Sequence, residues 1–251
     1  MTEEKIFGAI PLRTWNWLGV NDLKTSAPVE EKIIDVAPGE TKKFFDVNFS
    51  GEPGAKKITI NVEKSGRIEF VAADFGRGNF STDLEINLTG DNSSAEVDAI
   101  YFGDGDRKSD YNYIIRHRGK KTVANMNIRG ALKDKSDKIF RGTLDFRRGS
   151  KGSVGREFEE VLILSDGVRN RSVPIMLAGE DDVDGHHALT VGRRDEEKIF
   201  YLMSRGLDEG DAERLLVEAA FNPVVEKIDD EKIREKIFAE IQKRLGEKNF
   251  A

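Results

Sequence analysis

The stretch VDGHHALTVGRRDEEKIFYLMSRG, residues 183–206, separates two kinds of sequence. Before it the chain alternates short apolar bursts with glycine-containing turns, and after it the chain is highly charged and has the periodicity of helices. Asp195, Glu196 and Glu197 form an acidic run of the kind that favours the first turn of a helix. We therefore expect two domains to meet at this stretch, with His186 and His187 beside the boundary.

Upstream of the boundary, apolar and polar residues alternate with a period of two, which indicates half-buried β-strands. The clearest bursts are residues 58–62, 68–70, 84–88, 111–115 and 144–146. A sandwich, a barrel and a β-helix are all compatible with many short strands. Turn segments such as 90–94 and 103–109 contain few two-residue hairpin signals, which favours the stacked turns of a β-helix. In such a stack, inward side chains such as Ile86, Val97 and Tyr113 would form continuous columns.

Downstream of the boundary the sequence predicts three helices, at residues 195–205, 211–221 and 229–245. Gly206 suits the position after a helix end, and Pro223 is expected to stop the second helix. The last turn of a β-helix needs protection against edge-to-edge pairing. We expect the helices to cap that turn.

The chain is thus predicted to have three parts: an N-terminal arm and loop at 1–40, a β core domain at 41–192 and a C-terminal helical domain at 193–251. The arm contains Trp15 and Trp17, which we expect to be packing anchors on the body of the protein. Residues 25–40, with two prolines, are expected to form a loop that leads into the first strand.

Composition excludes several classes of protein. The 251 residues contain no cysteine, so the chain can offer neither disulfides nor thiolate ligands. A formal charge of -6 disfavours an extended nucleic-acid interface, and no apolar run is long enough for a membrane span. No P-loop is present, because the glycine-rich segment 149–155 lacks the closing Gly-Lys-Ser/Thr. We expect a soluble cytoplasmic protein that binds neither nucleic acid nor membranes.

The strongest candidates for chemistry are the two adjacent histidines. On an extended chain His186 and His187 point to opposite faces, so they cannot both bind one metal ion without distorting the backbone. A metal site is therefore expected to use His187, with His186 the weaker candidate. Stacked β folds also carry polysaccharide lyases and hydrolases, so a carboxylate- or metal-dependent enzyme acting on an extended polymer is an alternative function.

The boundary resembles the C-terminal signature of the SufB/SufD family of iron-sulfur cluster assembly proteins, V-x-C-S-H-G-A-T-V-G followed by an acidic stretch and F-Y-L-x-S-R-G. The matching residues are Val183, His187, Thr190, Val191, Gly192, Phe200, Tyr201, Leu202, Ser204, Arg205 and Gly206. Further matches are residues 162–166 with Pro174, His117 with Thr122, Gly130 and residues 140–142, and, downstream, Ala212 with residues 215–221. The resemblance covers roughly residues 75–225.

This resemblance implies a right-handed parallel β-helix with a small C-terminal helical domain. It implies a non-enzymatic scaffold of the Suf complex, which works with a SufC-type ATPase and with a SufB-type subunit or a second copy of itself. In such proteins the helical tail docks the ATPase. The resemblance therefore implies that the contact here is made by Phe200, Tyr201, Arg205 and Gly206. Dimerisation of the ATPase on ATP would move the β-helix pair and open an assembly site at their interface.

The departures from the family pattern refine this expectation. Gly185 stands where the family has a cysteine, two residues before its histidine, and only His187 remains of that site. The resemblance then implies a SufD-like role in which no cofactor is held stably by this chain alone. His187 would contribute one ligand to an iron-sulfur cluster bound transiently at a subunit interface, and the partner would supply thiolates. The chain is also short for the family, which argues against an extended N-terminal domain.

Overall fold

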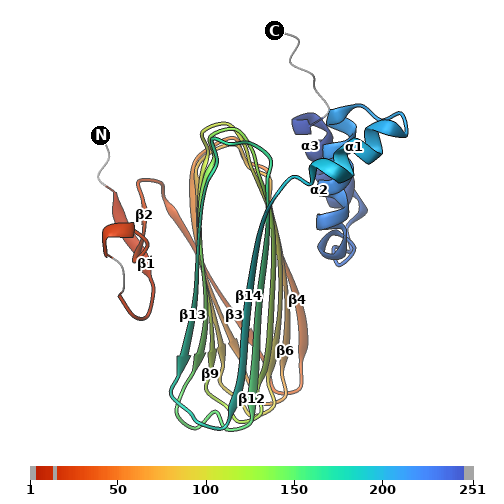
Figure 1. The fold of residues 1–251 in the computed structure, drawn as a ribbon. Helices are drawn as coiled ribbons and strands as arrows, with labels where there is room; N and C mark the ends of the chain where they lie inside the picture. Colours follow the sequence, from red (N-terminus) through yellow and green to blue (C-terminus); the bar gives the residue numbers. More distant parts are fainter. Residues whose placement is uncertain (1–3, 14–15, 246–251) are drawn as a thin grey trace.

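The computed structural model describes residues 4–13 and 16–245, and two parallel six-stranded sheets that face each other form most of this part (Figure 1). The first, here the odd sheet, comprises β3 (Val29–Val36), β5 (Gly54–Val62), β7 (Phe80–Leu88), β9 (Lys108–His117), β11 (Asp137–Phe146) and β13 (Arg169–Ala178). The second, here the even sheet, comprises β4 (Thr41–Asn48), β6 (Arg67–Asp74), β8 (Ser94–Gly103), β10 (Val123–Leu132), β12 (Ser153–Ile163) and β14 (Val183–Arg193).

The chain passes from one sheet to the other and back in each turn, so each strand from β3 to β12 pairs with the strand two further on. The repeat lengthens along the molecule: Val29 pairs with Ala55, 26 residues on, whereas Asp137 pairs with Arg169, 32 residues on. The result is a parallel β-helix of six stacked turns followed by helices. The predicted fold class is confirmed.

The interior of the early turns consists of apolar columns, one residue from each turn. Ile34, Ile60, Ile86, Ile115 and Leu144 pair in register along the odd sheet. Phe44, Phe70, Val97 and Met126 do the same along the even sheet. Ile86, Val97 and Tyr113 are all buried in this core, as their alternation predicted. Full burial of such side chains contributes about 1.5–3 kcal/mol each, which makes these columns the main source of stability.

The N-terminal segment forms an antiparallel pair, β1 (Lys5–Ala9) and β2 (Asp22–Thr25), on the outer face of the odd sheet (Figure 1). The anchor is a buried arginine rather than tryptophan: Arg141 of β11 donates to the carbonyl of Val20 and pairs with Asp110. Trp17 is 82% exposed, so its expected anchoring role is wrong, and Trp15 lies outside the described residues.

The expected loop at residues 25–40 is also wrong, because β3 lies within it. The strand β3 contains the charged run Glu30, Glu31 and Lys32, which is not typical of a buried strand, and it lies at the end of the odd sheet. An end strand has solvent on one side, so its sequence need not be strongly apolar.

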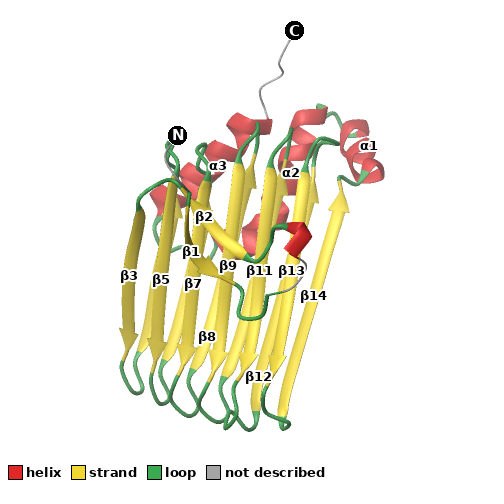
Figure 2. Ribbon diagram, turned by 90° about the vertical axis from the view of Figure 1, so that its left-hand side faces the viewer, coloured by secondary structure: helices red, strands yellow, loops and turns green. Residues whose placement is uncertain are grey.

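Three helices follow the β-helix: α1 (Glu196–Ser204), α2 (Glu209–Val225) and α3 (Glu231–Leu245). The helices α2 and α3 lie along the outer face of the even sheet and not over its last turn, and α1 packs on α2, so the expected cap is wrong (Figure 2). The reason is the outward face of the even sheet, where Val71, Ile100 and Phe102 form an apolar surface that only the helices cover. Val217, Phe221 and other side chains of α2, together with residues of α3, share this second core.

The second helix does not stop before Pro223 but continues to Val225. Proline removes one helical hydrogen bond and strains the preceding turn. Val224 and Val225 are each 1% exposed, and their burial against the sheet compensates for that loss. None of the helices in the described ranges is both long and apolar enough to cross a membrane.

Candidate functional site at the open end of the β-helix

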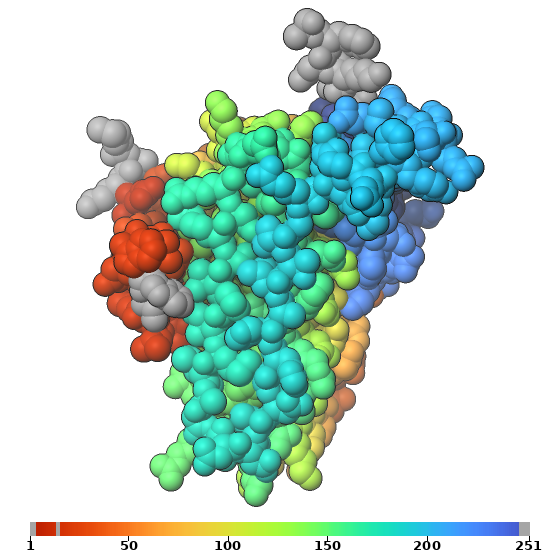
Figure 3. Space-filling model, in the orientation of Figure 1, coloured from red at the N-terminus to blue at the C-terminus, as the bar shows by residue number. Residues whose placement is uncertain are grey.

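The strand β14 forms one edge of the even sheet, and none of the strands in the described ranges pairs with its free side (Figure 2). Its side chains lie on the molecular surface, in the blue-green band on the front of Figure 3. Leu189 and Val191 are 42% and 49% exposed. The end of the β-helix is therefore open, with an apolar rim.

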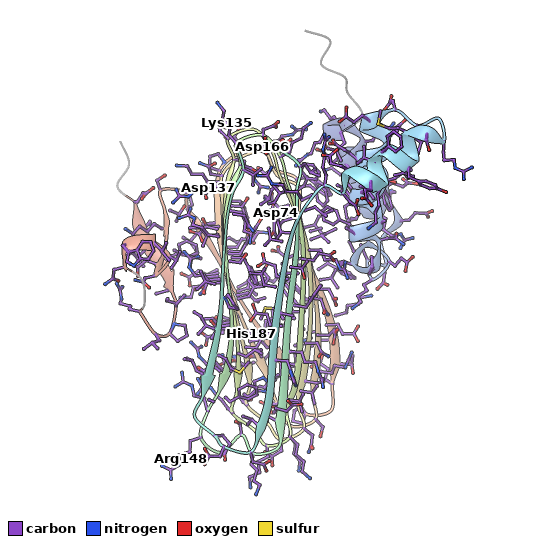
Figure 4. All side chains as sticks on the ribbon, in the orientation of Figure 1. Asp74, Lys135, Asp137, Arg148, Asp166 and His187 are labelled. Carbon is purple, nitrogen blue, oxygen red and sulfur yellow. The ribbon has the colours of Figure 1, made fainter. Side chains whose placement is uncertain are left out.

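The two adjacent histidines of β14 point in opposite directions. His187 pairs in register with Glu157 of β12, whose face is turned inward, and it lies between the two sheets in Figure 4. His186 points outward, and its Nε2 atom lies 2.7 Å from Oδ1 of Asp184. The predicted separation of the two imidazoles is confirmed, and the structure places His187 alone at the open end of the interior.

Directly beneath His187, Glu157 is only 5% exposed, and its Oε2 atom is buried without a hydrogen bond. Burial and, to a lesser extent, the nearby charge of Glu159 together raise the pKa of this carboxyl to about 8. The side chain occupies space that Gly142 leaves free, since a Cβ atom there would lie 1.9 Å from Oε1 of Glu157. The sequence analysis did not single out Glu157, although alternation along β12 assigns it to the inward face.

Gly185 also faces the interior, two residues before His187. A Cβ atom at this position would lie 2.7 Å from Sδ of Met176 and 3.1 Å from Cε2 of Phe146. In this chain, Met176 and Phe146 therefore fill the space into which the family's cysteine would project. A cysteine here would force one of these two side chains to move.

The interior is also polar one step further along the same strand. Lys138 is fully buried, forms an ion pair with Glu159 and donates to Oγ of Ser172 over 2.9 Å. Tyr101 donates to the same glutamate over 3.1 Å. Burial lowers the pKa of Lys138, although the charge of Glu159 opposes the change. The last turns thus enclose paired charges where the first turns enclose aliphatic columns.

His117 does not belong to this site, although the sequence pattern matched it to the family. It is completely buried, its ring stacks on Phe146 at 4.5 Å, and its Nδ1 atom lies 2.7 Å from Oγ1 of Thr122. Among residues 4–13 and 16–245, no three His, Asp or Glu side chains are placed to hold a metal ion together. The donor set of this chain, an imidazole and a carboxyl without a thiolate, fits part of an iron site and not a complete cluster site.

The predicted docking residues lie elsewhere, on α1 and in the two residues that follow it. Ile199 is buried and fixes this helix, whereas Phe200 is 74% exposed and Tyr201 is also exposed. The guanidinium of Arg205 lies 5.3 Å from the centroid of the Tyr201 ring. Gly206 has φ +99°, so it ends the helix in a conformation that few other residues adopt. The structure thus brings the four predicted residues together as an exposed aromatic and cationic surface.

The N-terminus of α1 is held by charged groups. Asp195 accepts a hydrogen bond from the backbone N–H of Lys198 and so caps the helix, which begins one residue after the predicted start. Arg194 forms ion pairs with Glu196 on α1 and with Glu209 and Glu213 on α2. These bonds tie α1 to α2, so the exposed surface is presented in a defined orientation.

Comparisons with known proteins identify the family of this chain. Residues 54–220 match the sequence model of the family described as "SUF system FeS cluster assembly, SufBD core domain". The chain is 29% identical over 182 residues to the iron-sulfur cluster assembly protein SufD of Bacillus subtilis, covering 72% of this chain and 42% of that protein. It is 30% identical over 168 residues to an iron-sulfur cluster assembly SufBD family protein of Mycobacterium leprae, with coverages of 64% and 43%. The chain therefore spans less than half the length of these relatives.

Proposed function

Since this chain belongs to the SufBD family and thus has a role in iron-sulfur cluster assembly, we propose that it acts there as a non-enzymatic scaffold subunit. In this role it works with a SufC-type ATPase and with a second SufB/SufD-type subunit. The cluster is cargo that the complex holds transiently, and this chain alone holds none stably. The partner subunit provides thiolates, because this chain has no cysteine.

The exposed edge of β14 is the observation that carries the assembly part of the proposal. An unpaired strand edge with an apolar rim is a template for pairing with another chain, and natural proteins seldom leave such an edge uncovered. His187 lies at this same end, so a partner that covers β14 would enclose the imidazole. A cluster site shared between two chains requires this arrangement.

The exposed surface of α1 supports the ATPase part of the proposal. Phe200 and Tyr201 present large apolar groups to solvent beside Arg205, and exposed aromatic and arginine side chains are frequent hot spots of protein interfaces. Hydrolysis of ATP belongs to the partner in this scheme, because the sequence lacks a P-loop.

The ATPase contact can be tested by co-purification with a SufC-type ATPase from the same genome. The variant Tyr201→Ala with Arg205→Ala should weaken the complex by about tenfold or more, as expected for a hot-spot pair. The matched control is Trp17→Ala, which removes another exposed aromatic side chain, from the N-terminal segment that lies across the β-helix from the helices. Unchanged binding of the double variant, with circular dichroism showing a folded protein, would refute this docking surface.

A further inference from the structure

Of the two inward-facing glutamates of β12, Glu159 is bonded on several sides and Glu157 is not. Glu159 pairs with Lys138 and accepts a hydrogen bond from Tyr101. Glu157 is equally enclosed, yet its Oε2 atom has no hydrogen-bond partner. Leaving a buried polar group unsatisfied destabilises a fold, and an apolar side chain of similar volume is often no worse in such a place. The unpaired carboxyl therefore indicates a ligand.

We propose that Glu157 and His187 form a carboxylate–imidazole pair that binds a divalent cation at the open end of the β-helix. The identity of that cation as ferrous iron rests on the proposed function, whereas the pairing of the two side chains does not. Glu157 thereby becomes a second ligand on this chain, one turn deeper than His187.

The register makes the two side chains direct neighbours on adjacent strands. Glu157 and His187 are direct partners in the parallel pair of β12 and β14, and both point inward. Neighbouring strands lie about 4.7–4.9 Å apart, so the two Cβ atoms are separated by about the same distance. Two ligand atoms at about 2.0–2.2 Å from one ion lie roughly 3 Å apart, which side chains of these lengths reach.

The surroundings accommodate the Glu157 carboxyl and leave the next strand open to further ligands. Gly142 provides the space that this carboxyl occupies, and any side chain at that position would collide with it. On the other side β14 has no covering strand within the described residues, so water or a partner's side chains can approach. Iron accepts imidazole and carboxylate together and keeps its remaining positions for other ligands. The pair is thus half of a site that a second subunit completes.

The direct test is an anaerobic titration of the full chain with Fe²⁺, using equilibrium competition against a chelator. Glu157→Gln keeps the size of the side chain and removes the anionic ligand, and His187→Gln removes the imidazole. Each variant should lower the affinity by about tenfold or more. The double variant should be hardly weaker than either single variant, because both side chains bind the same ion.

Matched controls are available on the same two strands. Glu160 of β12 points outward and pairs with Arg129, and His186 of β14 points outward beside Asp184. Glu160→Gln and His186→Gln should leave iron affinity unchanged. A loss in His187→Gln without a loss in Glu157→Gln would overturn the role of Glu157, and so would strictly additive effects of the two substitutions.

A second measurement does not depend on how the variants fold. In the unmodified protein labelled with ¹³C at glutamate carboxyls, Co²⁺ as a paramagnetic probe should broaden the signal of Glu157 before that of Glu160. A signal of Glu157 that stays sharp when one equivalent of Co²⁺ is bound refutes the proposal. The proposed scaffold function is judged separately, by binding of the ATPase to α1, which neither ligand substitution touches.

Discussion

His117 shows how far one enclosed side chain can control the response of this molecule to acid. Burial lowers the pKa of its imidazole from 6.5 to about 4. Its Nε2 atom is buried without a hydrogen bond, so a second proton on the ring would have no acceptor. Between pH 6.5 and 4 the unfolded chain therefore binds a proton at this residue that the folded chain does not bind.

The predicted consequence is that the free energy of unfolding falls as pH is lowered through this window, by up to about 3 kcal/mol from this residue. Urea unfolding between pH 4 and 7 should show the slope, and His117→Gln should reduce it even if the variant is less stable throughout. His186→Gln is the control, since that ring is exposed on β14. An identical slope in His117→Gln and in the unmodified protein would contradict the assignment.

At the scale of elements, the helices are held on the even sheet by one buried arginine as well as by apolar packing. Arg244 of α3 is 6% exposed and donates to the carbonyl oxygens of Phe75 and Phe102 at the end of the sheet. Its guanidinium also lies 5.1 Å from the centroid of the Phe102 ring and 3.5 Å from Asp104. One side chain thus satisfies groups from two successive turns.

Replacing this arginine should therefore loosen the helical part while the β-helix stays intact. Arg244→Ala is expected to cost about 2–4 kcal/mol, because it removes a buried charged donor from the carbonyl of Phe75 and weakens the bonding of Asp104, which keeps its bond from Arg77. Hydrogen exchange should increase in α3 and not in β7 or β9. Lys243→Ala is the matched control, since that side chain is exposed on the same turn of the helix. Equal exchange in both variants would show that apolar packing alone holds α3.

At the scale of the whole molecule, the repeat that determines the fold was readable from the chain. Period-two alternation predicted the strands and the interior position of Ile86 and Val97, and Asp195 and Gly206 marked the ends of α1. The family signature then identified His187. These features depend on residues that are close together in the chain, so they can be predicted from the sequence alone.

What could not be predicted depends on how distant segments meet. The apolar outward face around Ile100 and Phe102 exists only once the strands are stacked, so the helices were expected at the wrong place. Glu157 gave no signal because a glutamate on a strand is usually solvated, and only register with His187 and the space at Gly142 distinguish it. The prediction that Trp17 is buried was wrong for the opposite reason, since a large apolar residue need not be buried.

The open end of the β-helix should determine how the molecule assembles. If β14 pairs with a second SufB/SufD-type chain or with a second copy, then Leu189→Lys with Val191→Lys should disrupt that contact, because both side chains lie on the exposed rim. Light scattering after size exclusion should show the mass of a pair for the unmodified protein, or for its mixture with the partner, and separate subunits for the variant. Val123→Lys is the control, as an exposed apolar residue on the inner strand β10. A variant that still pairs while folded would place the subunit contact away from β14, and His187 would then face solvent in the complex.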